Sequence, residues 1–153
     1  MKQIKCGLAL MTACLLLAAC ASTSAEPQPP DIAYGQDLCA ECGMIISDAE
    51  FAAALIPSKG EPLKFDDIGD MAIYHLDHPD TQPKAWFVHD YPSAAWMRGE
   101  TAFYVMAPPG SSPMGSGLVA FAERSAAEKF AAERSANVLT FDEMRVLVHE
   151  KLH

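Results

Sequence analysis

Residues 51–76 read FAAALIPSKGEPLKFDDIGDMAIYHL, and this stretch predicts a complete supersecondary unit. Two short apolar runs flank Pro57-Ser-Lys-Gly60, a combination that is typical of a β-hairpin. Either Asp66 or Asp67 can cap a following helix, because a carboxylate accepts hydrogen bonds from the free N–H groups of a first helical turn. Apolar residues then recur at helical spacing. The stretch therefore predicts two strands, over 51–56 and 63–65, and a helix from about residue 68.

The rest of the sequence repeats this order of elements. Lys84-Ala-Trp-Phe-Val88 predicts a third strand, which completes a ββαβ unit. Later in the chain, two patterns of the capping-box type predict helix starts, Ser125-x-x-Glu128 and Thr140-x-x-Glu143. We therefore expect an α+β fold of two tandem ββαβ units in one small domain. The strands of the second unit are expected over 102–106, 118–121 and 138–139, and the final helix is expected to end near Leu152.

The N-terminus has the pattern of an exported protein. Lys2 and Lys5 precede an apolar run over 8–19, which is too short for a typical transmembrane helix and fits a secretory signal peptide. The run ends in Leu17-Ala-Ala-Cys20, which resembles the bacterial lipobox, in which the cysteine becomes the lipidated first residue of the mature protein. Ordinary cleavage close to Cys20, without lipidation, is the alternative.

Processing at this position divides the chain into three parts. We expect a signal peptide over 1–19, the lipidated Cys20 with a flexible spacer over 20–30, and the folded domain over 31–153. The spacer is rich in small residues and proline, so it cannot bury apolar surface. Acyl chains on Cys20 would tether the domain to the periplasmic side of a membrane. Ala21 favours the outer membrane over the inner one, because lipoproteins retained at the inner membrane usually have Asp there.

The charge of the chain excludes one broad class of partner. The 153 residues include 20 Asp+Glu and 11 Lys+Arg, for a formal charge of −9. Nucleic-acid phosphates would be repelled by such a protein, so we expect no nucleic-acid binding. Loss of Lys2 and Lys5 leaves 9 basic residues against 20 acidic ones, a mature charge of −11. This surface suits a basic patch on a partner, or simply keeps the protein soluble.

Only two of the five cysteines are expected to remain as thiols in the mature protein. Cys6 and Cys14 leave with the signal peptide, and Cys20 is lipidated. The remaining pair forms the motif Cys39-Ala-Glu-Cys42-Gly-Met44. Such a pair can be a structural disulfide, a redox-active dithiol or half of a zinc site. None of these three roles accounts for Met44.

The surroundings of this motif favour a soft metal. A redox pair normally follows a strand and opens a helix, and zinc normally needs four ligands, whereas the sequence offers neither that setting nor a second cysteine pair. Thiolate and thioether ligands select Cu(I). Met114 is a second thioether candidate, because it lies in a Pro/Gly/Ser loop, whereas Met71 and Met144 have the helical spacing of core residues. His89, after the third predicted strand, is a candidate nitrogen ligand or a surface residue.

Five motifs follow one another along the chain: Cys39-x-x-Cys42-Gly43-Met44, Phe65-Asp66-Asp67-Ile68-Gly69, Val88-His89-Asp90-Tyr91, the segment from Trp96 to Tyr104-Val105, and Pro113-Met114-Gly115. In this order they resemble the NosL-type lipoproteins, which are copper chaperones of nitrous oxide reductase maturation. The resemblance extends over residues 31–153. It implies a tandem ββαβ fold and Cu(I) bound outside the cytoplasm by Cys42, Met44 and Met114, with Cys39 as a further candidate ligand.

The resemblance also implies the role and the partners. We expect a membrane-tethered Cu(I) chaperone, not an enzyme, that delivers copper for the copper–sulfide centre of nitrous oxide reductase. Its partners would be the reductase and the ABC-type membrane complex that matures it. The principal alternative is a periplasmic thiol–disulfide oxidoreductase that uses Cys39 and Cys42. A structural lipoprotein with a permanent bridge between these two cysteines is a third hypothesis.

Overall fold

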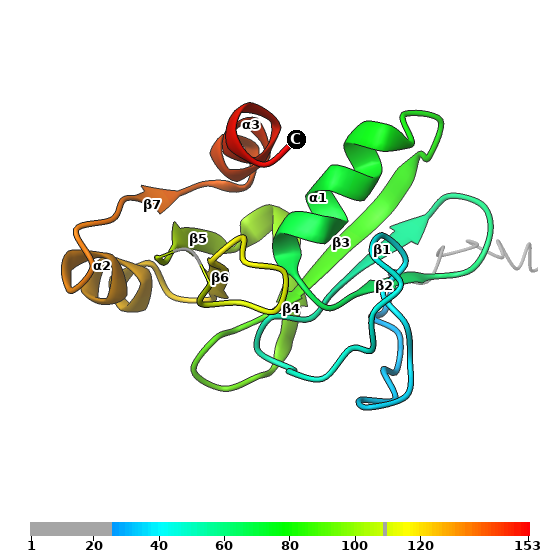
Figure 1. Ribbon diagram of the computed structural model, residues 1–153, viewed down its shortest axis with the longest axis horizontal. Coiled ribbons are helices and arrows are strands. Elements are labelled where there is room, and N and C mark those ends of the chain that lie inside the picture. The colour runs from blue at the N-terminus through cyan, green and yellow to red at the C-terminus, as the bar shows by residue number, and fades with distance from the viewer. Residues whose placement is uncertain (1–25, 109) are drawn as a thin grey trace, which may run out of the picture.

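A computed structural model describes residues 26–108 and 110–153. The signal peptide and Cys20 predicted from the sequence lie outside these residues. No helix in the described ranges has the length and apolar character needed to cross a bilayer. The elements in chain order are β1 (Ala53–Pro57), β2 (Leu63–Phe65), α1 (Ile68–Asp77), β3 (Pro83–His89), β4 (Trp96–Arg98), the 3-10 helix η1 (Gly99–Thr101), β5 (Phe103–Met106), β6 (Leu118–Phe121), α2 (Arg124–Ala132), β7 (Val138–Leu139) and α3 (Phe141–Lys151) (Figure 1).

The two sheets have the same internal order, which confirms the predicted repeat. The first sheet is ordered β2-β1-β3-β4 and the second β6-β5-β7, with every strand pair antiparallel. In each sheet the first hairpin strand is central, flanked by its hairpin partner and by the strand that follows the helix. The short strand β4 was not predicted; it pairs Trp96 with His89 at the edge of the first sheet.

Helix starts follow the predicted capping chemistry in two cases out of three. Asp67 is the N-cap of α1, and its side chain accepts a hydrogen bond from Gly69 N at 2.7 Å. The capping box of Thr140 at α3 is present as predicted. The box at Ser125 was wrong, because α2 already begins at Arg124 and Glu128 instead pairs with Arg124 at 2.9 Å.

The principal hydrophobic cluster spans both units. α1 lies beside α3 (Figure 1), and the residues directly after β3 form an isolated bridge with β6 of the second sheet, where Tyr91 N donates to Ala120 O at 2.8 Å. The core predictions for Met71 and Met144 are confirmed, since both are fully buried. The principal core cluster takes residues from the first unit, the second unit and α3, among them Phe65, Ile68, Met71, Tyr104, Leu118, Met144 and Val148.

Candidate metal centre

Both cysteines lie in a short loop that folds back on itself, residues 38–45, here called the cysteine loop. Leu38 and Ile45 form an isolated antiparallel bridge at its base. Cys39 N donates to Met44 O at 2.8 Å, and Gly43 N donates to Cys39 O at 3.0 Å. The turn requires φ of +73° at Gly43, a left-handed conformation that glycine adopts without strain. The loop thereby presents both sulfur atoms to the same region.

The cysteine loop docks on the edge of the first sheet, next to the start of α1. Ala40 N donates to Lys64 O of β2 at 2.8 Å, and the Lys64 ammonium pairs with Asp37 at 2.7 Å. Because β2 leads directly into Asp66 and α1, these contacts bring the thiols to the first turn of the helix.

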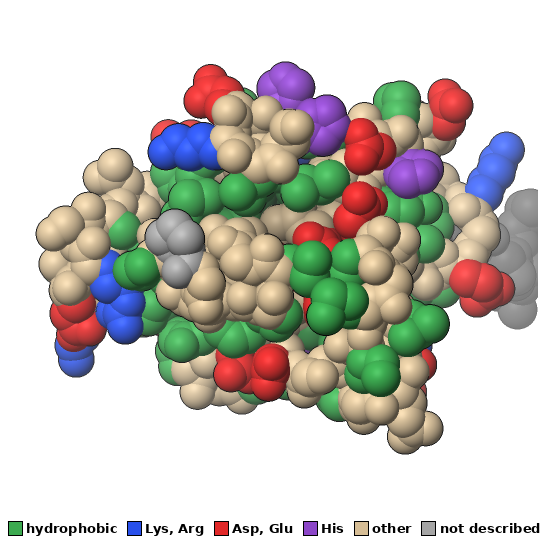
Figure 2. Space-filling model, in the orientation of Figure 1, with side chains coloured by type: hydrophobic (Ala, Val, Ile, Leu, Met, Phe, Trp, Pro, Cys, Tyr) green, Lys and Arg blue, Asp and Glu red, His purple; other side chains and the backbone are tan. Residues whose placement is uncertain are grey.

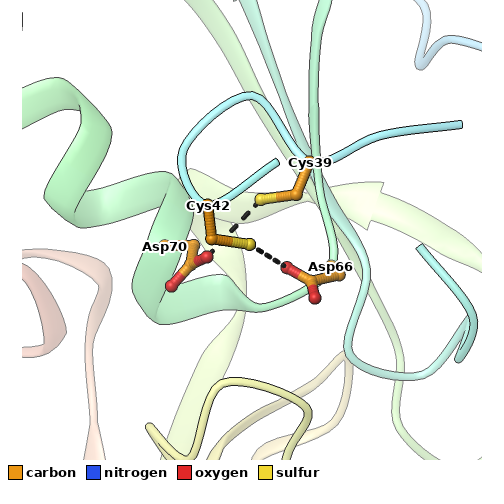
Figure 3. A group of neighbouring side chains, drawn as sticks. All are labelled: Cys39, Cys42, Asp66 and Asp70. Atoms are coloured by element: carbon orange, nitrogen blue, oxygen red, sulfur yellow. Dashed lines mark hydrogen bonds between the residues drawn. The ribbon is translucent and has the colours of Figure 1, made fainter. Parts of the chain in front are cut away.

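Two carboxylates complete a four-residue group, here called the Cys/Asp cluster. Cys39 Sγ donates to Asp70 Oδ2 at 3.4 Å, and Cys42 Sγ donates to Asp66 Oδ1 at 3.6 Å (Figure 3). One ligand atom from each residue lies within 4.8 Å of the others. Asp66 immediately precedes the N-cap of α1 and Asp70 lies in the first turn of the helix, so both carboxylates come from the start of α1. Both cysteines are free thiols, and the four residues together could hold a metal ion.

Burial controls the protonation of this cluster. It raises the pKa of the Cys39 thiol. It also raises the pKa of the Cys42 thiol, which is less deeply buried. Burial also raises the pKa of Asp70 to about 6, with a further contribution from the charges of Asp67 and Asp66. The thiols are thus protonated at neutral pH in the metal-free protein. A bound cation would stabilise the deprotonated ligands, so metal and protons compete for this site.

The structure places the two candidate thioether residues on exposed loops near the cluster. Met44 is 55% exposed and lies two residues after Cys42. Met114 is 40% exposed, and its backbone N donates to Asp67 Oδ2 at 3.3 Å. The loop that carries Met114 therefore lies against the start of α1, next to Asp66 and Asp70 of the cluster.

His89 has a different environment from the one considered from sequence. Its side chain is buried, with Nδ1 at 2.9 Å from Ala52 O and Nε2 at 3.3 Å from the Tyr34 hydroxyl. The imidazole lies on Trp96, with ring centroids 3.7 Å apart. The surface position considered as an alternative is therefore wrong. His89 does not belong to the Cys/Asp cluster, and both its ring nitrogens already have partners.

Comparison with known proteins identifies the family. The profile of the NosL family matches residues 32–147. The chain belongs to the NosL family. Among solved structures, the crystal structure of the copper chaperone NosL from Shewanella denitrificans is similar, with 22% sequence identity and a TM-score of 0.65. The match covers 76% of this chain and 96% of that chain, and it supports the tandem ββαβ fold. A search of curated proteins finds no match.

Sequence reasoning found the sulfur atoms of this NosL protein but not all of the cluster. Cys39 and Cys42 were candidates from their spacing, and Asp66 was considered first as a cap. Asp70 was missed, because a carboxylate in the first turn of a helix is ordinarily explained by the helix dipole. The available signal was the run of three acidic residues at the predicted helix start, Asp66, Asp67 and Asp70, of which a cap needs only one.

The raised pKa of Asp70 predicts how this NosL protein responds to pH without metal. Because its folded pKa, about 6, exceeds its ordinary value of 3.8, the contribution of Asp70 to stability is greatest below pH 3.8 and is lost as pH rises through about 6. Asp70→Asn should therefore gain stability relative to the parent between pH 4 and pH 7, by on the order of 1–3 kcal/mol. Urea unfolding with a chelator present measures this difference.

The exposed Asp80→Asn variant is the matched control, because it removes a carboxylate from the loop after α1 without touching the cluster. A difference between Asp70→Asn and the parent that stays constant over this pH range would contradict the assignment of the titration to Asp70.

Proposed function

We propose that this NosL protein is a Cu(I) chaperone, tethered to the membrane, that delivers copper for assembly of the copper–sulfide centre of nitrous oxide reductase. The observation that carries the proposal is the pair of free thiols in the Cys/Asp cluster, bordered by two loops with exposed methionines. Sulfur ligands select Cu(I) over harder cations. The similar protein from Shewanella denitrificans, a copper chaperone by its title, supports the same role.

Copper is the cargo in this mechanism. Cys39 is buried and Cys42 is partly exposed, so one thiolate would anchor the ion while the other remains within reach of an acceptor. Met44 and Met114 would supply thioethers from the exposed side. Because Cu(I) is stable with only two or three soft ligands, a ligand from the acceptor protein can bind the ion before a ligand of this protein dissociates.

The surface around the cluster suits transfer to another protein. Figure 2 shows exposed hydrophobic side chains, with acidic groups between them, on the face that includes this region. Binding of an apolar partner surface there would exclude water from the ion during exchange. Of the seven exposed large hydrophobic residues in the described ranges, five lie on or beside the two sulfur-bearing loops: Tyr34, Leu38, Met44, Ile45 and Met114.

The setting of the thiols argues against the oxidoreductase alternative. A redox dithiol needs a lowered pKa on its attacking thiol, commonly from a helix N-terminus. In this protein burial raises the pKa of both Cys39 and Cys42, and the cysteine loop opens no helix. A non-enzymatic carrier role accounts for buried thiols better than thiol–disulfide exchange does.

The location and partners belong to the same proposal. A lipid on Cys20 would place the domain at the periplasmic face of a membrane, with the outer membrane favoured over the inner one. The partners would be nitrous oxide reductase and its ABC-type maturation complex, approached through the acidic surface of this protein.

Cu(I) titration of the full-length lipoprotein, isolated in detergent, tests the proposal. Free thiols are counted first, and Cu(I) is then added without oxygen in competition with a chromogenic Cu(I) chelator. We expect both thiols to be reduced and a single Cu(I) per chain to be retained against the chelator. A stable disulfide between Cys39 and Cys42, with no copper retained, would overturn the chaperone role.

A further inference from the structure

Asp67 makes more contacts than a helix cap requires. Its carboxylate is fully buried, and Oδ1 accepts the capping hydrogen bond from Gly69 N. A cap of this kind needs one acceptor oxygen. Yet Oδ1 also accepts from Ser116 Oγ at 2.5 Å, and Oδ2 accepts from Ser112 Oγ at 2.5 Å and from Met114 N at 3.3 Å. Three of its four bonds therefore go to one distant loop.

This loop, residues 110–117, belongs to the second unit and joins β5 to β6. The two serines that bond Asp67 also bond the backbone of the loop. Ser112 Oγ accepts from Gly117 N at 2.9 Å, and Ser116 Oγ accepts from Leu118 N at 3.1 Å. Both serine side chains are buried, whereas Met114 between them is exposed. The loop is thus fixed on each side of Met114 and at its backbone N–H, while the thioether is left free to bind.

The close approach of the loop to α1 also depends on a glycine in the helix. A Cβ atom on Gly69 would lie 2.6 Å from Ser116 Cβ, so only glycine allows this contact. Asp66, just before the cap, and Asp70, in the first turn, contact the two thiols. Asp67 therefore connects the turn that faces the sulfur atoms to the loop that carries Met114.

From these contacts we propose that Asp67 is a positioning residue for the copper site. It fixes the Met114 loop of the second unit against the cysteine-facing turn of the first, so that the thioether is held ready beside the thiolates. The inference rests on the proposed Cu(I) site. Loss of this support should weaken copper binding chiefly through Met114.

Asp67→Asn separates this role from capping. An asparagine retains one oxygen, which can still accept from Gly69 N, but its NH₂ group cannot accept from Ser112 or from Met114 N. We expect the Kd for Cu(I) to rise about 10- to 100-fold, the usual range for loss of a residue that orients a metal ligand. X-ray absorption of the Cu(I) form should show one sulfur fewer around copper than in the parent.

Two serine variants provide a milder test and its control. Ser112→Ala removes one of the bonds to Asp67 and should weaken Cu(I) binding in the same direction if Asp67→Asn proves unstable. Ser111→Ala makes the same change one residue earlier, where the hydroxyl donates to Pro108 O and makes no bond to Asp67. We expect Ser111→Ala to bind Cu(I) as the parent does.

A double-mutant cycle with Met114→Ala decides whether Asp67 acts through the thioether. In the Met114→Ala background, Asp67→Asn should leave the Kd for Cu(I) unchanged within about twofold. An equal loss of affinity in both backgrounds, or an unchanged sulfur count in Asp67→Asn, would overturn the inference while the chaperone proposal stood. Failure of the parent to bind Cu(I) would instead overturn the proposed function.

Discussion

Replacement of Cys42 by Ser is expected to weaken Cu(I) binding by about a hundredfold or more. The scale comes from the structural zinc sites of zinc-finger peptides, where a full ligand set contributes about 10–16 kcal/mol, so that loss of one of a few ligands removes a substantial share. Serine keeps the size of the side chain but offers a hard oxygen in place of a soft sulfur, which Cu(I) binds poorly. Anaerobic competition with a Cu(I) chelator measures the change in Kd.

Glu41→Gln is the matched control for this variant. Glu41 lies between the two cysteines in the same loop, but its carboxylate is not part of the Cys/Asp cluster. We expect it to bind Cu(I) as the parent does, with a small change in salt dependence. If Cys42→Ser also bound Cu(I) with the affinity of the parent, the cysteine loop would not be the copper site.

Phe65→Ala should cause the largest loss of stability, about 3–5 kcal/mol in the free energy of unfolding. Phe65 is fully buried at the end of β2, and its ring packs edge-on against Tyr74 with centroids 5.5 Å apart. Truncation leaves a cavity at the point where the first sheet, α1 and the second unit meet. Urea unfolding monitored by circular dichroism measures the loss.

Val146→Ala, on the exposed side of α3, is the control variant for this experiment. Its free energy of unfolding should differ from that of the parent by no more than about 0.5 kcal/mol. A loss below about 1 kcal/mol for Phe65→Ala would show that the ring is not part of a tightly packed core. Because Phe65 immediately precedes Asp66 and Asp67, Phe65→Ala should also lower Cu(I) affinity.

The elements that could be predicted from sequence are those set by neighbouring residues. The hairpin turn after β1, the cap of α1 by Asp67 and the box at Thr140 all depend on a few consecutive side chains. β4 is only three residues long, Trp96–Arg98, and shows no periodicity that would distinguish a strand. The Ser125 box failed because Arg124 and Glu128 form an ion pair inside the helix instead.

The candidate site was predictable only in its sulfur atoms. The spacing of Cys39 and Cys42 and the presence of Met44 are local, so their chemistry could be argued from the chain alone. The role of Asp70 depends on the cysteine loop docking against α1, a contact between segments about 30 residues apart in sequence. The burial of His89 depends likewise on Trp96 and Tyr34, which no local pattern brings together.

The core shared by the two units makes this repeat indivisible. Residues of both halves and of the terminal helix pack into one cluster, and Asp67 joins the halves again at the site. A fragment of either half would expose the apolar residues that this cluster buries. Each unit therefore depends on the other for part of its interior, so the two are expected to fold together and not one by one.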